Sequence, residues 1–106
     1  LTKIEGGENM EVVMVEFAAG SDQIDDCVAV LTELMNTLVA KQEQFHGATI
    51  HVEESTGKVI NIMRWDRAQD FIDFRDANQN IIGPAIGQFN PEGRLLKIAT
   101  EIKKQS

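Results

Sequence analysis

Three residues in the middle of the chain could together bind and activate a small molecule. Asn61 and Trp65 lie in KVINIMRW, residues 58–65, whose length and branched side chains predict a β-strand. Residues two and four apart in a strand point to the same face, so Asn61 and Trp65 share that face with Val59 and Met63. Burying an amide without a partner costs about 1–3 kcal/mol. An asparagine at the centre of an apolar strand therefore requires an explanation.

The third residue, His51, lies in the preceding predicted strand, ATIHVEE, residues 48–54. A three-residue loop, Ser55-Thr56-Gly57, would close the hairpin with its glycine in the left-handed conformation. This turn pairs Glu54 with Lys58 and places His51 opposite Asn61. A carboxamide, an imidazole and an indole donor on one apolar face are typical of a small-ligand pocket.

Each of these residues also has a structural interpretation. A tryptophan at the end of a core strand can serve packing, and an asparagine can bond a helix or a buried water. A histidine near a sheet edge can simply be exposed. Because all three are expected on one face, a role in function is as well supported by the sequence as a purely structural role.

The elements that must position these residues follow from hydrophobic periodicity. A strand is predicted over residues 10–17, a helix over about 22–42, a second helix over about 66–78, and a last strand over 94–100. Residues 81–92 contain both prolines and are predicted to be irregular. The order strand, helix, strand, strand, helix, strand predicts an α+β fold of the ferredoxin-like split βαβ type, with an antiparallel four-stranded sheet whose first and third strands are central.

Both central strands are apolar on both faces, yet two helices can cover only one face of the sheet. A second copy of the chain would cover the other face, so a homodimer is expected. On the helix-covered face, four apolar helix residues would either bound a ligand cavity or fill it. These are Leu34, Leu38, Phe71 and Phe74.

Composition limits the class of protein. The 106 residues suit a single domain, predicted over 10–106 after a flexible arm at 1–9. The formal net charge of −7 argues against nucleic acid and anionic membranes as partners, and no apolar run approaches the roughly 20 residues of a membrane span. The single cysteine, Cys27, and the absence of a secretory pattern suggest the cytoplasm. With two histidines and one cysteine, no metal site is expected.

The segment HGATIHVEESTGKVINIMRWDRAQDFIDF resembles the core of the antibiotic biosynthesis monooxygenase family, whose members are small dimeric α+β barrels. The features that carry the resemblance are a glycine after the first helix, a hairpin that ends in an arginine-tryptophan pair, and a helix with an alanine and an aromatic residue. Here they are Gly47, Arg64-Trp65, Ala68 and Phe71. The resemblance covers about residues 10–100.

The resemblance implies a cofactor-independent monooxygenase that converts a small phenolic or polycyclic aromatic compound to a quinone with O2. Such enzymes carry an asparagine and a tryptophan four apart on this strand, and a histidine on the preceding strand. Asn61 would then stabilise the substrate oxyanion, Trp65 would orient the substrate, and His51 would assist proton transfer.

Two departures from that pattern leave an alternative open. The chain has Phe71 where such enzymes place a phenol, and it contains no tyrosine. It also has no arginine in residues 81–92. The alternative is a relative that binds or isomerises a small hydrophobic molecule without oxygenase activity. The haem-degrading members use an axial histidine on the second helix, and residues 67–80 contain none, so haem breakdown is not expected.

Overall fold

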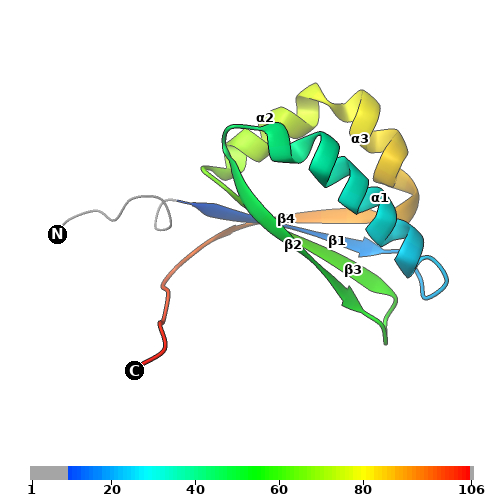
Figure 1. Ribbon diagram of the computed structural model, residues 1–106, viewed down its shortest axis with the longest axis horizontal. Helices are drawn as coiled ribbons and strands as arrows, with labels where there is room; N and C mark the ends of the chain where they lie inside the picture. Colours follow the sequence, from blue (N-terminus) through cyan, green and yellow to red (C-terminus); the bar gives the residue numbers. More distant parts are fainter. Residues whose placement is uncertain (1–9, 106) are drawn as a thin grey trace.

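A four-stranded antiparallel sheet is covered on one face by the helices that the structure describes (Figure 1). The computed structural model describes residues 10–105, so the predicted arm at residues 1–9 lies outside the described residues. The strand order is β2-β3-β1-β4. The strands are β1 (Glu11–Ala18), β2 (Phe45–Glu53), β3 (Lys58–Trp65) and β4 (Pro91–Lys97); the α-helices are α1 (Ile24–Thr37), α2 (Ala68–Ala77) and α3 (Gln79–Ile86), and the 3-10 turns are η2 (Val39–Lys41) and η3 (Gly87–Phe89).

The predicted ferredoxin-like α+β fold is confirmed. Strands β1 and β3 occupy the centre of the sheet, as their apolar residues on both faces indicate. On the covered face, alternate residues of both strands are buried beneath the helices, and they form the core together with α1. The strand residues of this core are Val13, Val15, Phe17, Val59, Met63 and Trp65.

Two helix predictions are corrected. The first helix ends at Thr37 and is followed by the separate turn η2, whereas one helix was predicted over 22–42. The segment 81–92, predicted to be irregular, contains most of α3, although Pro84 lies inside that helix. Ile82 is buried and Ile86 packs against the core. Burial of this apolar pair, one turn apart, outweighs the hydrogen bond that a proline removes from a helix.

The hairpin register is also corrected. Four residues, Glu54 to Gly57, form the loop, and Glu53 rather than Glu54 pairs with Lys58. The Gly57 amide donates to the Glu53 carbonyl over 3.0 Å, and Gly57 takes the predicted left-handed conformation with φ +72°.

This shift of one residue moves every β2 side chain to the opposite face of the sheet. Ile50, not His51, therefore lies opposite Asn61, and His51 pairs with Ile60. The His51 side chain is exposed, and its Nε2 lies 2.8 Å from the hydroxyl of Thr49. The prediction that His51 shares a face with Asn61 is wrong.

Strand boundaries differ at both sheet edges. Strand β2 begins at Phe45, so His46 lies in the strand at a bulge between the Phe45 and Gly47 pairs. There its imidazole contacts the Asp66 carboxylate. Strand β4 spans 91–97 rather than 94–100, because its pairing with β1 starts opposite Phe17.

The second face of the sheet carries no helix among residues 10–105 (Figure 1). Half-buried or exposed apolar residues occupy its centre: Val12, Met14, Ile60, Ile62 and Leu96. Beside them, Glu16 accepts from Lys58 over 3.0 Å and lies 3.6 Å from Arg94. These ion pairs hold the pKa of Glu16 below its usual value, with the Lys58 hydrogen bond as the largest cause. None of the helices in residues 10–105 has the length and hydrophobicity of a membrane span.

Candidate functional site

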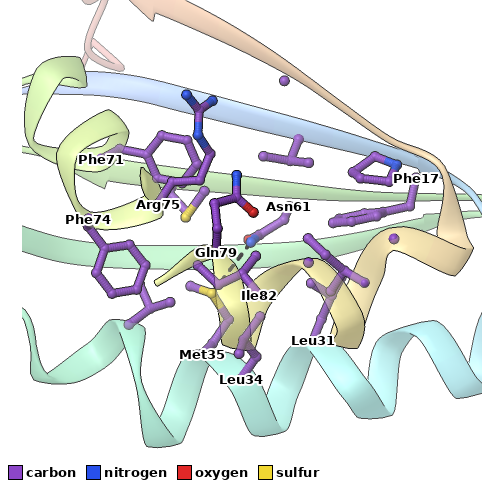
Figure 2. Close-up of a pocket in the computed structure, with 18 residues that line it drawn as sticks. Phe17, Leu31, Leu34, Met35, Asn61, Phe71, Phe74, Arg75, Gln79 and Ile82 are labelled. Atoms are coloured by element: carbon purple, nitrogen blue, oxygen red, sulfur yellow. Dashed lines mark hydrogen bonds between the residues drawn. The ribbon is translucent and has the colours of Figure 1, made fainter. Parts of the chain in front are cut away.

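A cavity of about 240 Å³ lies between the covered face of the sheet and the three α-helices (Figure 2). Strands β1 and β3 form its floor, and α1, α2 and α3 form its walls. Most of the lining is apolar, with three polar side chains among it. The polar side chains are Asn61, Arg75 and Gln79, and the apolar ones include Val15, Phe17, Leu31, Leu34, Met35, Met63, Phe71, Phe74 and Ile82.

Asn61 is the buried polar residue of this cavity. Only 2% of it is exposed, and it is the one buried polar or charged residue among those described. Its Nδ2 donates to the Met35 sulfur over 3.5 Å, and a thioether is a weak acceptor. Its Oδ1 is buried with no hydrogen-bond partner within the described part of the chain. The amide is thus nearly unpaired beside an open space.

Trp65 does not line the cavity. It is fully buried in an aromatic cluster, with its ring centroid 5.5 Å from that of Phe45, 5.8 Å from Phe71 and 5.7 Å from Phe74. Its Nε1 is buried without a partner in residues 10–105. Trp65 is therefore separated from the cavity by Phe71 and Phe74, which it packs against and which form part of the lining. The sequence correctly predicted that Trp65 shares a face of the sheet with Asn61. It did not predict that Trp65 lies behind the residues that line the cavity.

The predicted lining residues divide into two groups. Leu34, Phe71, Phe74 and Met63 line the cavity. Val59 and Leu38 do not. Val59 lies two residues before Asn61 in β3, pairs with Phe17 and is fully buried in the core. Leu38 follows the last residue of α1 and only packs against the core from its edge.

Arg75 and Gln79 were not predicted to belong to the site. Arg75 follows Phe71 by one helical turn on α2, so it occupies the same helix face, and this spacing was the available signal. Its guanidinium carbon lies 5.9 Å from the centroid of the Phe71 ring. Its Nε and Nη2 each donate to Asp76 Oδ1 over 3.2 Å. Gln79 begins α3, an element that the sequence did not reveal.

The electrostatics of the cavity are simple. Arg75 is the one charged residue in its lining, as far as residues 10–105 show. The buried thiol of Cys27 lies in the core, where burial raises its pKa to about 11 and keeps it protonated at neutral pH. No cluster of three or more histidine, cysteine, aspartate or glutamate residues that could hold a metal ion occurs in the described residues. The cavity thus combines an apolar lining with one cation and two amide side chains.

Comparisons with known proteins identify the fold. No family model matches the sequence, and no curated protein matches it. Among solved structures, a monooxygenase from Streptomyces coelicolor in complex with the ligand nanaomycin D superposes with a TM-score of 0.78 at 16% identity, over 98% of this chain and 100% of that one.

Two further structures agree. A putative antibiotic biosynthesis monooxygenase from Bordetella bronchiseptica gives a TM-score of 0.74 at 15% identity, covering 87% of this chain and 99% of that one. A putative monooxygenase from Shewanella loihica gives 0.73 at 15% identity, covering 91% and 100%. The resemblance read from the sequence is thus confirmed at the level of the fold: this chain has the fold of the antibiotic biosynthesis monooxygenases.

Proposed function

We propose that this protein is a cofactor-independent monooxygenase that oxidises a small phenolic or polycyclic aromatic compound with O2. The observation that carries the proposal is the Asn61 amide, which is buried and nearly unpaired at the wall of an apolar cavity. A buried amide without partners costs about 1–3 kcal/mol. A phenolic or enolic hydroxyl would donate to the unpaired Oδ1, and an oxyanion would accept from Nδ2 in place of the Met35 sulfur. The fold of the solved monooxygenases supports the same assignment.

The reaction balances without a cofactor. For an anthrone, loss of a proton from the ring CH2 group gives an enolate, which passes one electron to O2. The resulting carbon radical and superoxide combine, and the peroxide takes up the proton to give a hydroperoxide. Cleavage of its O–O bond with loss of the remaining hydrogen of that carbon releases water and leaves the quinone carbonyl. One O2 is consumed, one of its atoms enters the product, and the other leaves as water.

The residues have distinct roles in this proposal. Asn61 Nδ2 donates to the enolate oxygen, where preorganised donors lower the barrier by stabilising developing charge. Trp65 is a positioning residue, because it packs against Phe71 and Phe74, which line the cavity. His51 takes no part, since it lies on the opposite face of the sheet. The proton released on enolisation passes to water.

Oxygen uptake tests the proposal. Metal-stripped protein and an anthrone substrate in an oxygen electrode should consume O2 above the spontaneous rate. Asn61→Ala should remove this excess, Trp65→Phe should reduce it, and His51→Ala, the matched control on the opposite face, should retain it. Equal rates in the parent and Asn61→Ala would contradict the assignment. Binding of the substrate without uptake would instead support the alternative, a small-molecule-binding or isomerising protein.

The uncovered sheet face supports a second proposal, a homodimer. Its central residues are apolar and half-buried or exposed, and Leu96 is 41% exposed. Burying apolar surface is favourable by about 25 cal/mol per Å², so the same face of a second copy would cover this one favourably. Light scattering on the eluted protein should give twice the chain mass, and Ile62→Lys should give the chain mass. A parent protein that elutes as a monomer at micromolar concentration would refute the dimer.

The free, buried Cys27 supports the further proposal of a reducing, cytoplasmic location.

A further inference from the structure

We propose that the cavity binds its aromatic ligand as an oxyanion, and that Arg75 is the residue that selects the ionised form. This inference rests on the proposed function only in taking the same cavity as the ligand site. It names a substrate class, a fused-ring aromatic compound with an acidic hydroxyl, and a specificity-determining residue that the sequence pattern did not indicate.

The charge of the cavity lining is the first argument. Arg75 supplies the positive charge of the cavity, and the described lining contains no other charged residue and no histidine. The Asp76 carboxylate, which lies outside the lining, pairs with the guanidinium. The whole chain has a formal net charge of −7, so its overall field repels anions. A single cation in the cavity of an acidic protein therefore provides local recognition of an anion rather than general attraction.

The geometry of Arg75 is the second argument. A guanidinium has five N–H donors in a fixed fork. Here Nε and Nη2 bond to one oxygen of Asp76, and Nη1 bonds no group in the described residues. The guanidinium also lies over Phe71, a cavity residue. In Figure 2 it stands at one edge of the cluster of side chains, with Leu34 and Met35 at the opposite edge and Gln79 and Asn61 between them.

The size of the cavity is the third argument. An engineered apolar cavity of about 150 Å³ holds a benzene molecule, so a volume of about 240 Å³ accommodates two fused rings. Such a ligand can place its ionised oxygen at Arg75 and its apolar edge against the α1 side chains. A ring carbonyl or second hydroxyl then lies between the Gln79 and Asn61 amides.

Binding of a coloured naphthoquinone tests this inference directly. The probe is 2-hydroxy-1,4-naphthoquinone, which is ionised at neutral pH and whose visible spectrum differs between its ionised and neutral forms. The matched neutral compound is its 2-methyl ether. The wild-type protein should bind the hydroxy compound at least about tenfold more tightly than the ether, because charge-assisted hydrogen bonds are roughly twice as strong as neutral ones. The bound probe should retain the spectrum of the anion.

Three variants assign the effect. Arg75→Gln should weaken binding of the anion about tenfold and leave binding of the ether unchanged. Asp76→Asn removes the carboxylate that competes for the guanidinium, and it should tighten binding of the anion severalfold. Arg67→Gln is the matched control: its side chain is 73% exposed at the start of the same helix, outside the cavity, and it should match the wild-type protein.

Several results would overturn the inference. These are equal affinity for the two compounds, no binding of either, a bound probe with the neutral spectrum, or an equal loss in Arg75→Gln and Arg67→Gln. Thermal unfolding of each variant would show that the fold is intact. The probe is already a quinone, so its binding does not depend on oxygenation. A protein that binds the anion through Arg75 but consumes no O2 would refute the proposed function and leave this inference standing. A protein that consumes O2 but does not bind the anion through Arg75 would refute this inference and leave the proposed function standing.

Discussion

Replacing Asn61 by leucine should make the protein more stable. In the native fold the amide has one weak bond to the Met35 sulfur and an unpartnered Oδ1, so the wild-type residue already carries the cost of a buried, unsatisfied polar atom. That cost is about 1–3 kcal/mol. The loss of the N–H···S contact offsets part of it. Leucine has the same number of side-chain heavy atoms in the same branched shape, and the adjoining cavity accommodates its larger methyl groups. It adds apolar contacts beside Met35, so we expect a net gain of about 1–2 kcal/mol.

Urea denaturation gives the measurement, with the fluorescence of the single tryptophan as the signal. Wild-type and variant must be compared at one protein concentration, because association contributes to apparent stability. The melting temperature should rise by about 4–8 °C for each kcal/mol gained. Asn36→Leu, at an exposed position of α1, is the matched control and should change stability by no more than about 0.5 kcal/mol.

The opposite outcome would refute the reasoning. A loss of more than about 2 kcal/mol in Asn61→Leu would show that the amide bonds the core, directly or through a buried water. Its role would then be structural. A gain in stability accompanied by loss of oxygen uptake would be the trade-off expected when a residue is retained for function at a cost in stability.

Three other predictions concern single residues elsewhere in the fold. Gly57→Ala should destabilise the protein by about 2–4 kcal/mol, because Gly57 has φ +72° and an added Cβ would lie 2.7 Å from the Gly20 and Ser21 backbone; Gly87→Ala, where an added Cβ meets nothing within 4 Å, is the control, and equal urea midpoints for the two would contradict this. Burial raises the pKa of Cys27 from 9.0 to about 11, so the thiol should be unreactive toward a disulfide reagent at pH 8 until the chain unfolds. Because that raised pKa favours the protonated thiol in the folded state, the free energy of unfolding should fall as the pH rises from 9 to about 11. Cys27→Ala should reduce this fall. An identical pH profile in the wild-type protein and Cys27→Ala would refute the assignment of the fall to Cys27. His51→Ala should leave the affinity of the cavity for the neutral methyl ether unchanged in a dye titration, since His51 lies on the opposite face of the sheet.

Much of the fold could be predicted because it follows from local patterns. The apolar residues on both faces of the segments 10–17 and 58–65 indicated the two central strands, and the structure confirms both. The left-handed conformation of Gly57 also follows from its place at the end of a tight loop. These features depend on the period of the side chains and on backbone sterics, which neighbouring residues determine.

The incorrect predictions concern features that depend on contacts between residues distant in the sequence. Helix α3 forms around Pro84 because Ile82 and Ile86 reach the core, and no local propensity predicts that. The hairpin could close with three or four loop residues. The four-residue loop is the one in which Val52 pairs with Val59 and Ile50 with Asn61 on the covered face, and this choice placed His51 outside the site.

The sequence by itself determined the order of the elements, the buried position of Asn61 and the shared face of Asn61, Met63 and Trp65, because a strand alternates its side chains with a fixed period of two. Only the tertiary structure decided which of these residues border open space. The cavity exists where α2 and α3 meet the sheet, so packing between elements distant in sequence set Trp65 behind Phe71 and Phe74 and brought Arg75 and Gln79 to the same cavity as Asn61. The volume left between packed elements depends on how all of them fit together, and no single segment of the sequence determines it.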